Sequence, residues 1–166
     1  MKILTLLSLT VGAALAQDIA ADTKSMYVMT RTNLLKSAEK IPAELYAYRP
    51  TPEVRSIAEL FGHIAEAQYL FCSPLKGEPN PQVKIEKVKT SKEELIKALT
   101  EAFEYCDTAY NKATDAEMGE KVKFFNRERT KNGVMQFNSI HNYEHYGNLV
   151  TYMRLNKIVP PSSEGR

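Results

Sequence analysis

The sequence has little net charge, few cysteines and only one long apolar run. Each of these features excludes some classes of protein. A formal charge of +2 over 166 residues is too small to favour a nucleic acid or an anionic membrane as partner. Two cysteines cannot form the dense disulfide framework of a small secreted scaffold. The length suits one domain with its own core, and the sequence shows no internal repeat. These features indicate an ordinary globular domain.

The one long apolar run lies at the start of the chain. Lys2 precedes an uncharged apolar stretch over residues 3–16, which ends in the small-x-small pattern of a cleavage site. The stretch is shorter than the roughly 20 residues that a membrane-spanning helix needs. It predicts a signal peptide over residues 1–16, removed before Gln17, and an exported domain over residues 17–166 that is periplasmic or secreted, with no membrane partner after cleavage. An uncleaved anchor or an apolar first helix is the alternative.

Export would place Cys72 and Cys106 in an oxidising compartment, where a disulfide can persist. Cys106 also falls on the apolar face of a predicted helix, so a buried inert thiol is equally consistent with the pattern. The two cysteines lie toward the same end of the molecule if their helices run parallel. They lie toward opposite ends, and cannot pair, if the helices run antiparallel.

Hydrophobic periodicity predicts four helices in the rest of the chain. The first spans about residues 18–40, the second begins at Ser56, the third begins near Ser91, and the fourth spans about residues 132–156. The second and third helices each begin with a Ser-x-x-Glu capping box. The core-facing side of the first helix is expected to hold Met26, Met29, Asn33, Leu34, Ser37 and Ile41. That of the fourth is expected to hold Val134, Phe137, His141, His145, Leu149 and Tyr152.

No convincing set of strands interrupts this pattern, since residues 115–130 are polar and irregular. We therefore predict an all-α fold, a four-helix bundle with a long connection between helices two and three. That connection covers residues 73–90 and contains several prolines. Fully extended, such a segment reaches roughly 59 Å, whereas a helix of the same length spans about 27 Å. The connection can therefore cross the bundle, and helices two and three need not be antiparallel neighbours.

The chain contains three histidines, and all of them fall on or beside helix faces that should point inward. His141 and His145 form an HxxxH pair on one helical face, about 6 Å apart along the axis. His63 lies in the middle of the second helix. Buried imidazoles need hydrogen-bond partners or a metal ion to offset their desolvation. Three imidazoles from two helices would form a metal site with open positions, whereas core histidines bonded to backbone oxygens are the alternative.

Several motifs resemble those of the DinB/YfiT-like family, whose members are regarded as metalloenzymes. The stretch SIAELFGHI, which ends just after His63, is similar to the family's second-helix motif. The stretch HNYEHYGN, which contains His141 and His145, is similar to its fourth-helix motif. The resemblance covers about residues 20–161, and the order and spacing of the three histidines are its most specific part.

The resemblance implies a four-helix bundle in which one histidine from helix two and two from helix four bind one divalent metal ion, often zinc or nickel. It also implies that a homodimer could form. Some relatives transfer or isomerise small substrates with low-molecular-weight thiols, which are mainly cytoplasmic. Because this chain is expected to be exported, its reaction stays open between transferase and hydrolase chemistry.

Three glutamates lie near the predicted ligands in the sequence. Glu59 and Glu66 flank His63 by one turn on each side, and either could orient the imidazole. Glu59 is more simply the capping partner, and Glu66 is more simply a solvated charge. Glu144 lies between the two ligands of helix four but is expected to project from another face.

The first hypothesis is a metal-dependent enzyme acting on a small-molecule substrate, with His63, His141 and His145 as metal ligands. The pattern assigns no catalytic residue and no organic cofactor site. The second hypothesis is a metal- or ligand-binding stress protein without turnover, and the third is a structural bundle with three core histidines. Metal content separates the first two hypotheses from the third.

Overall fold

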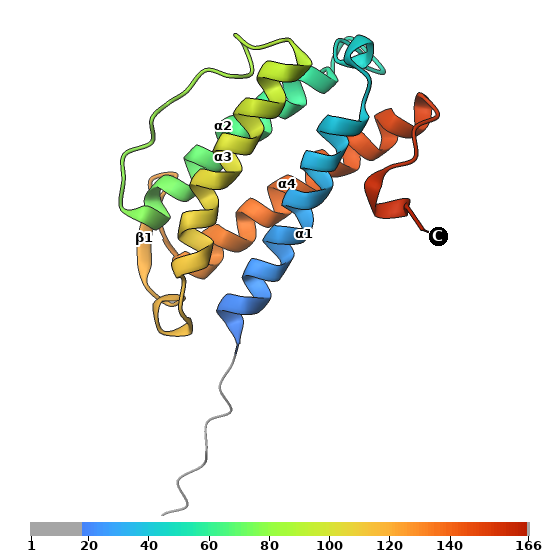
Figure 1. The fold of residues 1–166 in the computed structure, drawn as a ribbon. Coiled ribbons are helices and arrows are strands. Elements are labelled where there is room, and N and C mark those ends of the chain that lie inside the picture. The colour runs from blue at the N-terminus through green and yellow to red at the C-terminus, as the bar shows by residue number, and fades with distance from the viewer. Residues whose placement is uncertain (1–17, 166) are drawn as a thin grey trace, which may run out of the picture.

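The computed structural model describes residues 18–165, so the predicted signal peptide over residues 1–16 lies outside the described part. Its four helices form the bundle that the periodicity predicts (Figure 1). Among residues 18–165, no helix is long and apolar enough to cross a membrane. The helices are α1 (Ile19–Lys40), α2 (Ile57–Lys76), α3 (Lys92–Lys112) and α4 (Lys131–Leu155).

The start of α2 is a capping box, as predicted. The Ser56 hydroxyl accepts a hydrogen bond from the Glu59 amide at 3.3 Å, and the Glu59 carboxylate accepts one from the Ser56 amide at 2.7 Å. These two bonds satisfy backbone donors that the first turn of a helix leaves without partners. Gly77 ends α2 with a left-handed backbone, φ 70°. The helix runs into the segment that was predicted as connection from residue 73, and Pro74 lies within its last turn.

Each helix packs against two neighbours, in the cyclic order α1, α3, α2, α4. Helices α2 and α3 run parallel, while α1 and α4 run the opposite way (Figure 1). The connection over residues 77–91 must therefore return along the length of α2 before α3 can begin. A disulfide joins Cys72 of α2 to Cys106 of α3, which is the pairing that parallel helices allow.

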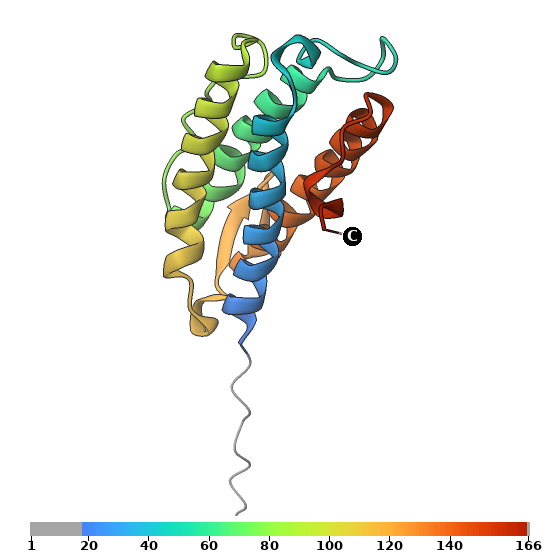
Figure 2. The ribbon, with the colours of Figure 1, turned by 45° about the vertical axis from the view of Figure 1, so that its right-hand side comes forward.

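A β-hairpin precedes α4 where the sequence indicated an irregular segment. Strands β1 (Lys121–Phe124) and β2 (Arg127–Thr130) pair antiparallel, with Phe124 opposite Arg127. The turn residues Phe125 and Asn126 both have positive φ, as in the tight turns that match strand twist. Figure 2 shows the hairpin at the end of the bundle where α3 leads into α4. The buried ring of Phe124 packs against Phe71, and this contact fixes the hairpin on α2.

Leu34, Ser37 and the capping residue Ile41 of α1 are buried as predicted, but the first half of its core face is shifted from the predicted one. Met26 and Met29 are 52% and 49% exposed, and the inward position belongs to Tyr27. Its hydroxyl donates to the Asp107 carboxylate at 2.8 Å, so a polar atom is satisfied inside the bundle. Hydropathy favoured the methionines because it does not register such a long-range partner. The buried residues of α1 are Thr23, Tyr27, Thr30, Leu34, Ser37 and Ala38.

Most of the predicted inward face of α4 is buried, but Phe137 departs from the prediction for a similar reason. Phe137 is 45% exposed, whereas Asn138 and Asn142 are fully buried. Both amides bond to Gln68 of α2, because its Nε2 donates to Asn142 Oδ1 at 2.9 Å and its Oε1 accepts from Asn138 Nδ2 at 3.1 Å. Each bond offsets part of the cost of burying an amide, although Asn138 Oδ1 and Asn142 Nδ2 have no partner among the described residues. This network joins α2 to α4 one helical turn away from the histidines.

Candidate metal centre

The structure brings the three predicted histidines together between α2 and α4. The Nε2 atom of His141 lies 3.1 Å from Nε2 of His63 and 3.1 Å from Nε2 of His145. One candidate ligand atom from each ring lies within 4.8 Å of the other two. His145 is buried, and His63 and His141 are half-buried. The three side chains are therefore close enough to hold one metal ion.

Burial keeps these rings in the neutral form. Desolvation, followed by the charges of His145 and His63, lowers the pKa of His141 to about 3. Desolvation, then His63, lowers the pKa of His145 to about 4. Desolvation also lowers the pKa of His63, although Glu86 opposes that shift. Neutral imidazole is the form that binds metal, so all three rings are ready to act as ligands near pH 7.

The three Nε2 atoms point at one another, and this arrangement suits a metal ion. Within the described residues, the buried Nδ1 atoms of His141 and His145 have no hydrogen-bond partner. These two rings therefore do not use Nδ1 to bond backbone oxygens, which is the arrangement expected of structural core histidines. The three Nε2 atoms also lie close together, and each neutral ring presents either an N–H or a lone pair at this nitrogen. A divalent cation would accept all three lone pairs at once.

Two residues near the cluster were not predicted from the sequence. Glu86, on the connection after α2, places its Oε2 3.3 Å from His63 Nδ1. Its Oε1 accepts a hydrogen bond from Arg55 Nε at 2.9 Å. Glu86 is far from the histidines in sequence and belongs to no helix, so periodicity could not place it. Arg55 stands just before the capping serine of α2, which is the one local signal that it lies near this helix end.

The glutamates that flank His63 behave differently from one another. Glu59 is the capping partner, as predicted, and also pairs with Arg49 at 3.0 Å. Glu66 is not a solvated charge, because its Oε1 accepts hydrogen bonds from the backbone amides of Ile85 and Glu86 at 2.5 and 2.8 Å. It therefore fastens the connection to α2 beside the cluster.

A cleft of about 570 Å³ opens beside His145. Its wall includes Glu144, which was expected to project from another face of α4. The cleft gives a small molecule access to the side of the cluster and offers both charge signs for binding it. Its lining residues are Arg49, Pro52, Glu53, Val54, Arg55, Glu59, Leu60, Glu86, Glu144, His145, Asn148 and Tyr152.

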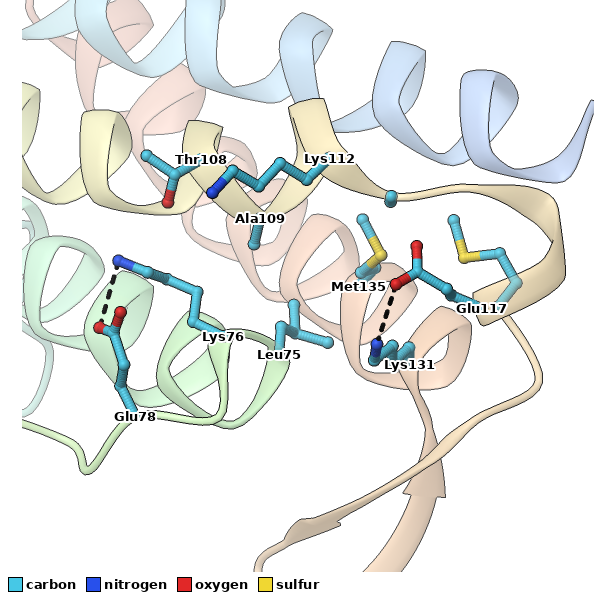
Figure 3. Close-up of a pocket in the computed structure, with 11 residues that line it drawn as sticks. Leu75, Lys76, Glu78, Thr108, Ala109, Lys112, Glu117, Lys131 and Met135 are labelled. Carbon is cyan, nitrogen blue, oxygen red and sulfur yellow. Dashed lines mark ion pairs between the residues drawn. The ribbon is translucent and has the colours of Figure 1, made fainter.

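A second pocket, of about 240 Å³, lies where the ends of α2 and α3 meet the start of α4 (Figure 3). Leu75, Ala109 and Met135 form its apolar part. Lysines at its edge pair with glutamates, Lys76 with Glu78 at 3.2 Å and Lys131 with Glu117 at 3.6 Å. The pocket contains none of the three histidines, so the candidate centre is the cleft beside His145.

Similar solved structures share this architecture. A DinB-like protein from Bacillus cereus ATCC 10987 superposes with a TM-score of 0.74 at 16% identity, covering 85% of this chain and 95% of that one. The mycothiol-dependent maleylpyruvate isomerase superposes with a TM-score of 0.65 at 11% identity, covering 78% of this chain and 60% of that one. At such identities the likeness concerns the fold alone.

The sequence itself has recognisable relatives. The uncharacterised protein YjoA of Bacillus subtilis (strain 168) is 32% identical over 120 residues, which cover 70% of this chain and 77% of YjoA. Its crystal structure superposes with a TM-score of 0.68. The family model described as the DinB superfamily matches residues 26–149, a span that includes all three histidines. The chain therefore belongs to the DinB superfamily.

Proposed function

We propose that this protein is a metal-dependent enzyme that holds one divalent ion on Nε2 of His63, His141 and His145. The observation that carries the proposal is that the Nε2 atoms of three neutral imidazole rings lie close together beside an open cleft. Among residues 18–165, no cysteine, aspartate or glutamate joins this cluster. A site with three protein ligands leaves coordination positions for water or substrate, as catalytic metal sites do.

Imidazole ligands suit zinc, nickel and similar ions. Such an ion would supply Lewis acidity or activate a bound water or thiolate, which fits transferase or hydrolase chemistry. The chain's own residues provide the surroundings. Glu86 Oε2 lies 3.3 Å from His63 Nδ1, and Arg55 Nε donates to Glu86 Oε1. Tyr152 of α4 lines the cleft, and its hydroxyl donates to the Arg55 carbonyl oxygen at 3.1 Å. This bond joins α4 to the segment before α2 at the cleft.

The solved structure of a mycothiol-dependent maleylpyruvate isomerase supports a small-molecule substrate, because its name shows that a similar fold supports chemistry on a small organic acid. We carry over neither mycothiol nor maleylpyruvate. The cleft here has its own mixture of two arginines and four glutamates, which favours a small polar substrate with groups of both charge signs.

We also propose that the protein is exported. The signal-like segment over residues 1–16 supports this, although it lies outside the described residues. The disulfide between Cys72 and Cys106 supports it as well, because disulfides persist in oxidising compartments and are rare in the cytosol.

Elemental analysis of untagged protein tests the metal site. We expect about one equivalent of a divalent metal, which the His141→Ala variant should lose. Asn148→Ala, at the cleft wall but outside the cluster, is the matched control and should keep its metal. Less than about half an equivalent, with weak re-binding of Zn²⁺, would favour a structural bundle.

Turnover separates an enzyme from a binding module. A panel of small ester, amide and thiol-transfer substrates should show activity that is lost on chelation and returns with metal. Stoichiometric metal without turnover, and without a water on the ion in a metal-loaded structure, would favour the non-catalytic alternative. Activity that survives complete metal removal would contradict the proposal.

A further inference from the structure

We propose that Glu86 is a positioning residue of the metal centre, and that the path of the connection over residues 77–91 places Glu86 beside His63. The proposal rests on the metal site proposed above. Metal-binding histidines generally donate their second ring N–H to a carboxylate or carbonyl, which fixes the ring and its tautomer. Of the three rings here, the described structure offers such a carboxylate to His63.

The path of the connection follows from the parallel arrangement of α2 and α3. Since α3 begins at the end of the bundle where α2 also begins, the chain must travel back along α2. Ile85 is buried on this path, so an apolar anchor sits directly before Glu86. The return journey thus brings a carboxylate to the first half of α2, where His63 lies.

Two features of α2 hold the connection at this height. Glu66 Oε1 accepts hydrogen bonds from two successive amides, those of Ile85 and Glu86. Gly62 leaves room for the backbone: a Cβ at this position would lie 2.5 Å from Glu86 Cα and 2.8 Å from Glu86 N. Both are backbone atoms, so they cannot rotate away as a side chain would. A glycine directly before His63 therefore lets the connection touch the helix.

The Glu86 carboxylate is itself held in place. Its Oε1 accepts from Arg55 Nε at 2.9 Å, which leaves Oε2 to face His63 Nδ1 at 3.3 Å. With the ring proton on Nδ1, the lone pair of His63 Nε2 points at the other two histidines. Glu86 thereby selects the tautomer that can bind metal.

Zinc affinity, measured by competition with a chromophoric chelator, tests the proposal. We expect Glu86→Ala to weaken Zn²⁺ binding about 10–100-fold. Glu86→Gln should lose less, because an amide oxygen still accepts the Nδ1 proton. Gly62→Ala should weaken binding although it alters no polar group, because its methyl displaces Glu86. Glu144→Gln removes the same charge from the same cleft without touching a ligand, and it should bind Zn²⁺ within about twofold of wild type.

The tautomer of His63 gives a readout that needs no metal. In ¹⁵N NMR of chelator-treated protein, His63 should carry its proton on Nδ1 in wild type and lose this preference in Glu86→Ala, with the helical circular dichroism unchanged. Unchanged affinity in Glu86→Ala, or a loss in Glu144→Gln as large as that in Glu86→Ala, would overturn the positioning role alone. A wild-type protein that binds no Zn²⁺ would overturn both this role and the proposed function.

Discussion

The Cα atoms of Cys72 and Cys106 lie 5.3 Å apart, and the disulfide between these residues joins α2 to α3 near the ends where both helices finish. This separation falls in the ordinary range for bridged cysteines. It depends on the parallel arrangement of the two helices, because an antiparallel pair would carry these residues to opposite ends. The same arrangement sends the connection past His63.

Removing the disulfide should lower the stability of the fold. The bridge closes a loop with a sequence separation of 34 residues. By reducing the chain entropy of the unfolded state, the bridge adds about 3–4 kcal/mol to the free energy of unfolding. The Cys72→Ala/Cys106→Ala variant should therefore unfold at a lower urea concentration. Dithiothreitol should destabilise wild type and leave this variant unchanged. A difference below about 1 kcal/mol between the two proteins would show that the bridge contributes little.

Gln68 should contribute more to stability than its polarity suggests. Replacing it with methionine keeps the approximate shape but leaves Asn142 Oδ1 and Asn138 Nδ2 without the partners they have now. Each abandoned buried group costs about 1–3 kcal/mol, so we expect a loss of roughly 2–4 kcal/mol in urea unfolding. Gln136→Met, at an exposed position of α4, should stay within about 0.5 kcal/mol of wild type. Equal effects at the two positions would contradict the network.

Metal should stabilise the folded protein, since the cluster forms only when α2 and α4 pack together. Free Zn²⁺ at 100 times its dissociation constant adds about 2.7 kcal/mol to the free energy of unfolding. For a domain of this size the midpoint of thermal unfolding should rise by about 5–10 °C. His145→Ala should abolish the rise, while Asn148→Ala should retain it. A rise of equal size in His145→Ala would mean that zinc binds elsewhere.

Stability of the metal-free protein should fall as the pH is lowered below about 6.5, the ordinary pKa of histidine. The pKa values of His141 and His145 in the folded state are about 3 and about 4, so the unfolded chain takes up protons first. The contribution of these two histidines to stability is therefore fully present above their pKa in the unfolded chain. It is lost as the pH falls toward their pKa values in the folded state.

Urea unfolding in the presence of a chelator at pH 7.5, 6.0 and 5.0 measures this slope. The His141→Gln/His145→Gln variant should show a shallower slope over the same range, because glutamine does not titrate. Parallel slopes for the two proteins would show that other groups carry the pH dependence.

Local sequence signals determined the helical bundle and the identity of the three histidines. Helical periodicity and the capping box at Ser56 act between residues three or four apart, so they can be recognised without knowing how the chain packs. The HxxxH spacing put His141 and His145 on one side of α4 for the same reason. The long connection after α2 also followed from its length and its prolines.

Tertiary packing decided everything that depends on partners distant in the sequence. Tyr27 and Asn142 occupy buried positions where Asp107 accepts from the Tyr27 hydroxyl and Gln68 donates to Asn142 Oδ1, and hydropathy cannot register such partners. Glu86 meets His63 because α3 runs parallel to α2, an arrangement that no local pattern specifies. The sequence by itself therefore determined which side chains could bind a metal, whereas the tertiary structure decided what surrounds and orients them.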